Sequence, residues 1–320
     1  MKKNACLFLA MFIVVSFGNS AKAADFSTEL GKMDIPVGAD VAGMGGASTA
    51  IPGFSSENPA VIAVKEDSSK VGVTGTYGYM GFKNGLNMDL YSPSFTLLSL
   101  PVGVVQLTFS DARSNVATLL DGTSSFQFNK VQSLDLQYGF PVSDSFYLGA
   151  SYSHSLSEVT MNVFEVGIFN TQSRGNTLGV GAMYRIGKVA NLGAYYEHSW
   201  DSADDFVDGD FYLNTKTHSS RLRLGASVQI TSTTLLAADY QHLYLAGGEK
   251  ADQYFFGAEQ YLAKDFAIYA GCANGGLNAG LGFYLKNGGV NLSYSHRPFR
   301  EMEEFLGNAK AFMASAYWTF

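Results

Sequence analysis

The stretch from Gly38 to Ala60, GADVAGMGGASTAIPGFSSENPA, decides how the rest of the sequence is interpreted. It is rich in Gly, Ala, Ser and Thr, has no strand periodicity, and carries two charges, Asp40 and Glu57. Pro59 fixes its own φ and disfavours a helical conformation at Asn58. Short strands and turns follow this stretch, and small side chains pack where large ones do not fit. We therefore expect it to lie inside a closed barrel, with a surface arm as the alternative.

The first residues have the pattern of a signal peptide. Lys2 and Lys3 precede an apolar run over residues 5–17, which Ala21-Lys22-Ala23 follows as a cleavage site. We expect residues 1–23 to be removed on export. The single cysteine that remains, Cys272, cannot form an internal disulfide.

The composition is unusual for a water-soluble domain. Only 15% of the residues are charged, compared with about 25% in typical globular domains, whereas 14% are aromatic. No apolar run after the signal approaches the roughly 20 residues of a transmembrane helix. These features favour an outer-membrane β-barrel, although a secreted β-sandwich or β-solenoid would share the glycine and strand content. The net charge of −7 and the lack of a basic tract argue against nucleic acid as a partner.

Turn signals divide the chain into about fourteen predicted strands, an even number as a closed bacterial barrel requires. The strands are predicted at 71–82, 87–99, 102–112, 124–140, 145–157, 174–186, 190–200, 219–230, 234–245, 253–262, 266–273, 277–286, 290–297 and 311–320. Short turns are expected near residues 100–101, 141–144, 187–188, 231–233, 263–265 and 286–289. Longer polar loops are expected at 113–123, 158–173, 201–219, 246–252 and 298–310.

Alternating polarity supports spanning strands. In the segment 221–230, the apolar residues Leu222, Leu224, Ala226, Val228 and Ile230 alternate with polar residues and glycine. One face of such a strand suits lipid and the other suits an aqueous lumen. A soluble sandwich would alternate in the same way, so this pattern alone leaves both architectures open.

Four of the five histidines occur in a Tyr-x-His pattern, at His154, His198, His242 and His296. Each follows a short turn by roughly ten residues, about one membrane crossing, in phase with the apolar face. We therefore expect an aromatic girdle at the boundary between lipid and water. At the C-terminus, Phe312, Ala314, Ala316, Trp318 and Phe320 share one face and resemble the signal by which the barrel-assembly machinery recognises outer-membrane barrels.

The run Gly43-Met44-Gly45-Gly46-Ala47, followed by Glu57-Asn58-Pro59-Ala60 and a first strand, resembles the N-terminus of the FadL-type outer-membrane transporters of long-chain fatty acids and hydrocarbons. The resemblance implies a hatch over residues 24–69 inside a fourteen-stranded barrel over residues 70–320. The start also resembles that of PorV-type barrels of a protein secretion system, which implies a non-transporting interaction barrel as the alternative. The predicted third strand, 102–112, has no Pro or Gly cluster of the kind that marks the lateral opening of FadL-type proteins. The exit route is therefore left open.

The hatch supplies most of the candidate site residues. We expect Asn58, Pro59 and Ala60 to form the gate, with Asn58 fixing the hatch through hydrogen bonds. Ile51 and Phe54 are candidates for lining an apolar ligand pocket, although simple packing of the hatch is the alternative role. The hydrophobic ligand would gain roughly 25 cal/mol for each Å² removed from water.

Among the inward polar residues, Arg221 and Arg223 are the best candidates to bind a ligand carboxylate, because two guanidiniums two residues apart face the same side. Cross-barrel ion pairs are the alternative role for them. Outer-membrane lipid and lipopolysaccharide are the expected surroundings.

No enzyme, cofactor or metal site is predicted. The sequence contains neither G-x-S-x-G nor H-E-x-x-H, and the Tyr-x-His histidines are expected to face lipid. A rim hydrolase is the alternative that such a barrel could still support. The acidic segment 201–210 offers oxygen ligands for Ca²⁺, but its spacing is not that of an EF-hand loop, so a solvated loop is expected.

Overall fold

The computed structural model describes residues 38–52, 56–64, 71–100, 103–118, 122, 124–163, 167–245, 248–298 and 303–320. The described helical elements are α3 (Ala39–Gly43), the 3-10 turn η1 (Val61–Ala63) and α4 (Glu303–Leu306). The described strands are β1 (Gly72–Phe82), β2 (Asn87–Leu100), β3 (Gly103–Ser114), β4 (Ala117–Thr118), β5 (Ser125–Pro141), β6 (Phe146–Val163), β7 (Gly167–Ile186), β8 (Ala190–Val207), β9 (Asp210–Thr231), β10 (Thr234–Tyr244), β11 (Lys250–Ala263), β12 (Phe266–Ala273), β13 (Gly276–Leu285), β14 (Gly288–His296) and β15 (Ala309–Thr319). None of the helices among these residues has the length and hydropathy needed to span a bilayer.

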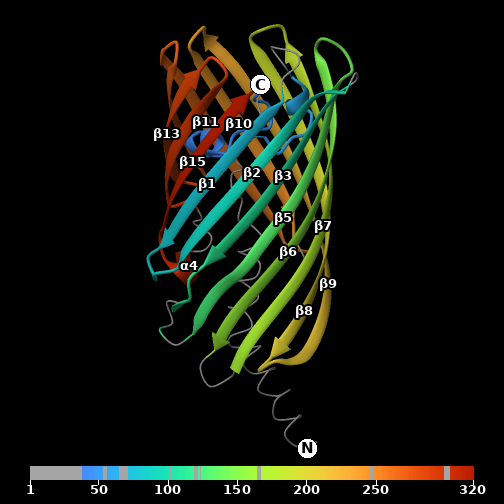
Figure 1. Cartoon of the computed structure of the whole chain (residues 1–320), viewed down its shortest axis with the longest axis vertical. Helices are drawn as coiled ribbons and strands as arrows, with labels where there is room; N and C mark the ends of the chain where they lie inside the picture. The colour runs from blue at the N-terminus through green and yellow to red at the C-terminus, as the bar shows by residue number, and fades with distance from the viewer. Residues whose placement is uncertain are drawn as a thin grey trace, which may run out of the picture.

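The strands form one closed antiparallel barrel (Figure 1). Sequential strands pair with each other, β15 pairs with β1, and β3 pairs directly with β5. The two-residue strand β4 lies beside β5 and is not needed for closure. Fourteen strands therefore make the wall of the described chain, which confirms the predicted number and the closed architecture.

The two rims of the barrel differ. The C-terminal rim carries the end of β15 and the short turns predicted from the sequence, such as residues 142–145, 187–189 and 232–233. The opposite rim carries the hairpin ends of β6–β7 and β8–β9, together with α4 (Figure 1). This arrangement places the first and last strands side by side with both chain ends of the barrel at one rim.

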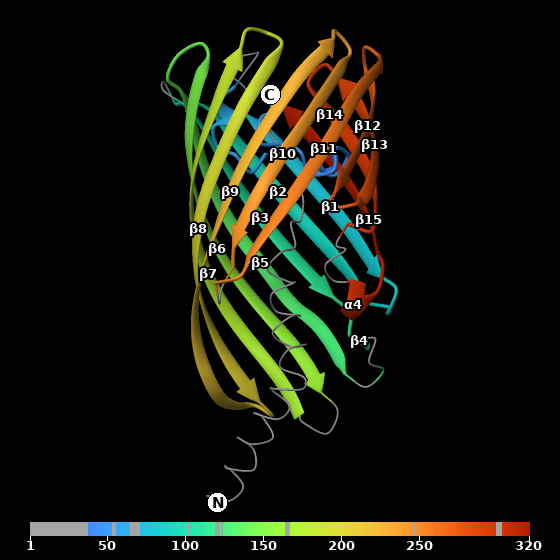
Figure 2. The same cartoon turned by 180° about the vertical axis from the view of Figure 1, so that it is seen from behind.

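Two predicted loops were wrong. Residues 158–173 and 201–219 belong largely to the hairpins β6–β7 and β8–β9, whose strands are 18 to 22 residues long. By contrast, β12 and β14 have 8 and 9 residues. The four long strands therefore project beyond the opposite rim as a wall on one side of the barrel (Figure 2). The outer halves of these strands are polar, and inter-strand hydrogen bonds stabilise them although they have no apolar face. The strands therefore continue beyond the point at which the alternation of apolar and polar residues in the sequence stops.

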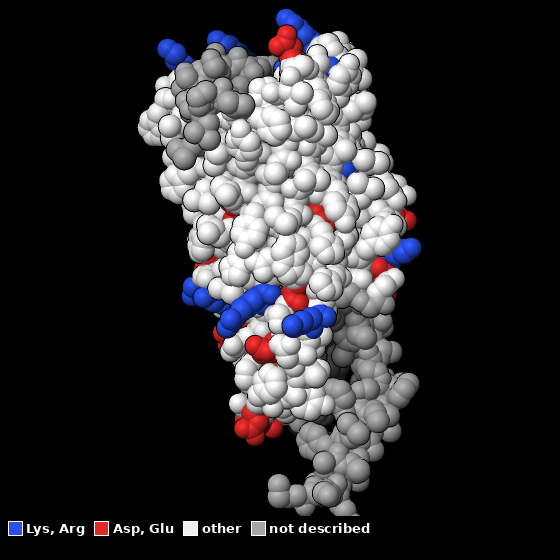
Figure 3. All heavy atoms as spheres, turned by 90° about the vertical axis from the view of Figure 1, so that its right-hand side faces the viewer, with Lys and Arg blue, Asp and Glu red and all other residues white. Residues whose placement is uncertain are grey.

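The outer surface of the barrel is apolar over a broad zone. Leu222, Leu224, Val228 and Ile230 of β9 are 36–58% exposed, as are similar residues on the other strands. On the face drawn in Figure 3, Lys, Arg, Asp and Glu gather near the C-terminal rim and across the opposite half, with a largely uncharged zone between them. Within the described barrel no second sheet covers this zone.

The Tyr-x-His pairs lie on this outer face, and three of them share a cross-strand partner. The Tyr152 hydroxyl and Nδ1 of His154 lie 2.7 and 3.1 Å from Oδ1 of Asn176. The pairs at His198 and His242 make the same arrangement with Ser220 and Asp252 on the next strand. Rings that face outward while their polar atoms bond along the barrel are typical of an interfacial aromatic girdle.

A candidate ligand cavity below the N-terminal segment

The N-terminal segment, meaning described residues 38–52 and 56–64, lies within the barrel near the C-terminal rim (Figure 1). Its helix α3 contacts β12, β13, β14 and β15, and η1 contacts β3, β5 and β6 on the other side. Almost every residue of the segment is buried. The small side chains noted in the sequence therefore allow a folded segment to fit within the wall.

Glycines in the wall make room for the segment. Six of them face it from β5, β6, β7, β8, β11 and β12: Gly139, Gly149, Gly181, Gly193, Gly257 and Gly271. A Cβ atom added to any of the six would lie only 2.0–2.5 Å from a segment atom. The backbone of the segment thus packs directly against the backbone of the wall. We call these six residues the wall glycines.

Asn58 joins the segment to itself and to the barrel. Its side-chain amide donates hydrogen bonds to the carbonyl oxygens of Thr49, at 2.9 Å, and of Ala182 in β7, at 3.1 Å. Its Oδ1 accepts a hydrogen bond from the amide of Ala60 at 3.1 Å. Pro59 packs against Gly139 and Gly149, and Ala60 is fully buried. The Asn-Pro-Ala motif is therefore a contact between the segment and strands β5–β7.

A buried carboxylate in the wall holds the first half of the segment. Oδ2 of Asp239 accepts hydrogen bonds from the amides of Ser48 and Thr49, at 2.9 and 3.0 Å, and from the Thr49 hydroxyl at 2.8 Å. The same oxygen lies 3.1 Å from Nε of Arg223, and both side chains are nearly inaccessible to solvent. Arg223 also donates to the carbonyl of Gly46 and stacks 4.3 Å from the centroid of the Phe255 ring. Such a buried charge is stable only because it is paired and hydrogen-bonded.

Glu57 of the segment meets both candidate arginines. Its Oε2 lies 3.0 Å from Nη2 of Arg221 and 3.3 Å from Nη1 of Arg223. Arg221 also pairs with Glu197 of β8, whose Oε1 lies 2.8 Å from its Nε. We call Arg221 and Arg223 the arginine pair. In this structure the carboxylate held by the pair is one of the chain's own.

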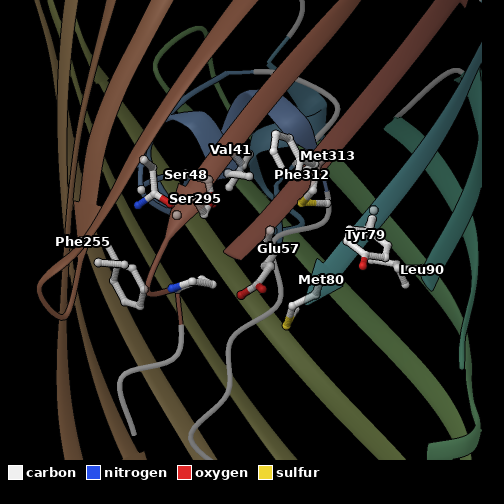
Figure 4. A pocket seen from close by; sticks show the side chains of 18 of the residues that line it. Val41, Ser48, Glu57, Tyr79, Met80, Leu90, Phe255, Ser295, Phe312 and Met313 are labelled. Atoms are coloured by element: carbon white, nitrogen blue, oxygen red, sulfur yellow. The ribbon is translucent and has the colours of Figure 1, made fainter. Parts of the chain in front are cut away.

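A cavity lies between the segment and the wall, with Glu57 and Arg223 among its lining residues. Most of its remaining side chains are apolar: Val41, Met80, Met88, Leu90, Phe255 and Met313 line it. Figure 4 shows Val41 and Glu57 of the segment facing the cavity, with Met80 and Leu90 on one side and Phe255 on the other. The site therefore combines an apolar compartment with one charged end.

An apolar cluster in the barrel interior connects this cavity to the opposite rim. The cluster comprises Met80, Phe82, Leu86, Met88, Ala112, Ala117, Phe126, Leu306, Ala309 and Ala311, with Phe128, Val131, Val159 and Met161 packed against it. Leu90 packs against this cluster and also against Ala39 and Ala42 of α3 and Met313 of β15. Apolar contacts therefore run without a break from α4 at the opposite rim to the N-terminal segment. Methionine suits such a surface because its flexible side chain adapts to different shapes.

No protein-family model and no curated protein matches this sequence. Solved structures do match. The toluene transporter TodX of P. putida superimposes with a TM-score of 0.61 at 12% identity, over 88% of this chain and 98% of that protein. A Pseudomonas aeruginosa FadL homologue superimposes with a TM-score of 0.63 at 12% identity, over 89% of this chain and 99% of that protein. The Ralstonia pickettii toluene transporter TbuX superimposes with a TM-score of 0.59 at 14% identity, over 88% of this chain and 97% of that protein. The fold is that of a FadL-type channel.

Within this FadL-type fold the predicted site residues are dispersed. Ile51 packs against the apolar cluster of Met44, Ala47, Ala237, Phe255 and Tyr269 and is not among the residues that line this cavity. Phe54 lies outside the described residues. Arg223 lines the cavity, whereas Arg221 reaches Glu57 from beside it.

Sequence reasoning missed Glu57 as a site residue. One signal was available, because Glu57 is one of only two charges in an otherwise neutral segment. The acidic residues 201–207 belong to strand β8 and not to a loop, and the described residues include no group of His, Cys, Asp or Glu arranged to hold a metal ion.

Proposed function

We propose that this protein takes up hydrophobic small molecules through the outer membrane, with the N-terminal segment acting as a hatch. The observation that carries the proposal is the unbroken series of apolar contacts from the opposite rim to the cavity beside the segment. TodX and TbuX, which share the fold, are toluene transporters, and this supports the same class of ligand.

The physical basis is burial of apolar surface. A hydrophobic molecule that leaves water for the apolar cluster gains about 25 cal/mol for each Å² buried, and each methionine can adjust to its shape. Passage further requires that the hatch move, because the segment is packed against the wall glycines. Asn58, Pro59 and Ala60 are then the gate, since they join the hatch to β5–β7.

An outer-membrane location belongs to the proposal. It is supported by the signal-like first 23 residues, the apolar outer zone and the outward aromatic side chains of Phe312, Trp318 and Phe320. Outer-membrane lipid and lipopolysaccharide would then surround the wall, and the barrel-assembly machinery would bind the terminal strand.

The test is mass spectrometry of small molecules extracted from gently purified protein, combined with uptake of 1-dodecanol into proteoliposomes. Wild-type protein should carry apolar ligand and take up 1-dodecanol. Met88→Asp, which places a charge in the cavity wall, should reduce both at least 10-fold. Ser153→Asp on the polar lumen face of β6 is the control and should retain both. The proposal would be refuted if wild type and Met88→Asp carried the same amount of ligand and if vesicles with either protein took up 1-dodecanol no faster than empty vesicles.

The second candidate is an interaction barrel that binds another protein at the opposite rim. The projecting hairpin β8–β9 favours it, because Phe211, Tyr212 and Leu213 near its tip are 45–61% exposed. Replacing residues 202–216 by Asn-Gly would shorten this hairpin and leave the barrel strands paired. If the shortened variant loses a co-purifying protein partner but takes up 1-dodecanol as wild type does, the hairpin has a binding role in addition to transport. If the variant loses a partner and wild-type protein takes up no 1-dodecanol, the second candidate is favoured.

A further inference from the structure

Strand β9 has an unpaired edge over its projecting half. It pairs with β10 only as far as Ser220, which lies opposite Tyr244 at the end of β10, but it pairs with β8 as far as Asp210. Residues 210–219 therefore have β8 on one side and no described strand on the other. In Figure 2 the hairpin β8–β9 extends well past the end of the hairpin β10–β11. We call residues 210–219 the free edge.

The backbone groups on the open side of the free edge follow from the register. Successive residues of a strand direct their N–H and C=O groups to opposite sides. The amide of Gln229 donates to the carbonyl of Val189, the residue before β8, and the β8–β9 register has no shift between there and residue 213. The odd-numbered residues of this part of β9 therefore bond to β8. Three even-numbered residues of the free edge direct these groups to the open side: Asn214, Lys216 and His218.

These backbone groups form a row without partners. No backbone group of a described residue bonds to Asn214, Lys216 or His218 on the open side, and all three residues are exposed. A row of unpaired N–H and C=O groups at the edge of a sheet is a template for a further strand. Addition of an extended peptide to such an edge is a common mode of protein recognition.

We propose that the free edge binds an extended segment of a partner protein as an added antiparallel strand. The segment alternates acidic residues with apolar or β-branched residues. It takes the place that β10 would occupy if β10 continued beyond Tyr244. This contact lies outside the ligand cavity and does not depend on transport, and it gives the second candidate function a specific surface and a class of partner.

The inner face of the free edge calls for apolar or β-branched side chains in the partner. Leu213, Thr215 and Thr217 share this face, and Leu213 is 49% exposed. An added strand places every second side chain directly beside this row. Pairs of β-branched and apolar side chains across neighbouring strands stabilise a sheet, so valine or isoleucine suits these positions.

The outer face calls for acidic side chains. Lys216 and His218 lie on this face in phase with the outward leucines of β9, and Lys216 makes no ion pair with a described residue. Lys250 stands over the ring of Tyr244, 5.2 Å from its centroid, at the base of the free edge. Opposite charges directly across two strands are stabilising. A carboxylate opposite Lys216 therefore favours the acidic segment over a neutral or basic one.

A second copy of the chain does not fit the free edge. Copies in one bilayer are related by rotation about the bilayer normal, so their β9 strands run in the same sense and cannot pair antiparallel. A lysine at an edge also disfavours pairing between identical strands. The same lysine admits a strand of opposite charge, and the partner is accordingly a different protein.

The first test follows the exchange of single amides by NMR in wild-type protein in lipid nanodiscs. The probe is the peptide acetyl-Val-Glu-Val-Glu-Val-Glu-Val-amide. The amides of Asn214, Lys216 and His218 should exchange rapidly in the free protein and at least 10-fold more slowly with the peptide. The amides of Thr215 and Thr217, which bond to β8, should change less than 2-fold. Protection of the first three amides without peptide, or no slowing with it, would overturn the inference.

The second test separates backbone pairing from attraction by charge. The glutamates of the added strand lie opposite Asn214, Lys216 and His218, so their N–H groups face β9 and the N–H groups of the valines face away. The peptide N-methylated at its glutamates should bind at least 10-fold more weakly. The peptide N-methylated at its central valines is the matched control and should bind within about 3-fold of the parent. Equal binding of the two methylated peptides would refute strand addition.

The third test changes the protein. Lys216→Pro removes an N–H group on the open side and leaves the bonds to β8 in place, as proline at a sheet edge can. It should weaken peptide binding at least 10-fold, with unchanged heat-dependent mobility in SDS gels and unchanged 1-dodecanol uptake. Lys216→Gln, which keeps the backbone donor, should bind the peptide more tightly than Lys216→Pro. Wild-type affinity in Lys216→Pro would refute the contact and leave the transport proposal standing.

Discussion

At the scale of single residues, the fit between the wall and the N-terminal segment depends on glycines, which have no side chain, as much as on hydrogen bonds and apolar contacts. Gly149 and Gly181 lie opposite Pro59 and Asn58, where a Cβ atom would stand 2.4 and 2.0 Å from the segment. These atoms belong to the backbone or to a bonded side chain, so they cannot yield easily. A residue with a side chain at either position should therefore displace the segment without opening the barrel.

We predict that Gly149→Val unseats the segment. Cleavage by added protease within residues 38–64 should become at least 10-fold faster, while the barrel band should keep its heat-dependent mobility in SDS gels. Gly75→Val is the control, because a Cβ atom at Gly75 has no neighbour within 4 Å. A protected segment in Gly149→Val would show that the close packing at this wall glycine does not hold it.

Asp239 should matter through its charge. Asp239→Asn keeps the shape but leaves the guanidinium of Arg223 without its buried counter-ion, and breaking such a pair costs about 3–5 kcal/mol. We expect hydrogen exchange at Ser48 and Thr49 to become about 10²–10³-fold faster, as measured by mass spectrometry. Unchanged exchange at these amides would mean that their hydrogen bonds to Asp239 contribute little to seating the segment.

At the scale of elements, the sequence predicted the strands that have an apolar outer face and missed the strand halves that lack one. Alternation and short turns gave β1, β2, β10 and β12 to within about one residue at each end. The outer halves of β6–β9 were missed because their polarity does not alternate, and backbone pairing alone holds them as strands. The meeting of Glu57 with Arg221 and Arg223 joins residues that lie more than 160 positions apart, and no local pattern encodes such a contact.

Two outward apolar residues should separate the strands within the bilayer from those beyond it. Leu292 lies midway along β14, and Ile168 lies on the projecting half of β7, and they are 41% and 49% exposed. We predict that Leu292→Arg destabilises the barrel by about 2–4 kcal/mol, whereas Ile168→Arg costs about 0–1 kcal/mol. Reversible unfolding in urea with lipid vesicles measures both. Equal costs would place both residues in the same surroundings.

At the scale of the whole molecule, lipid rather than a second sheet is expected to cover the apolar outer zone. The wall is closed by the pairing of β15 with β1 and of β3 with β5, so no further sheet of the described chain is available for that purpose. Large apolar patches exposed to water lead to association. The cross-strand bonds of the Tyr-x-His pairs mark the level at which this covering should end.

The whole protein should therefore require a surfactant. We expect a monodisperse species in detergent or nanodiscs and rapid aggregation once the detergent is removed, as followed by size-exclusion chromatography with light scattering. A monodisperse species in plain buffer would contradict the outer-membrane location and the transport proposal together.

The enclosure of the N-terminal segment also constrains the order of assembly. The described residues of this segment precede β1 in the chain, yet the finished wall surrounds them, and the wall closes where β1 meets β15. We expect the segment to enter while that seam is still open, so that the barrel forms around it. A chain that closed its seam first would hold an empty lumen, and its own N-terminus would have to reach the six glycines through a rim.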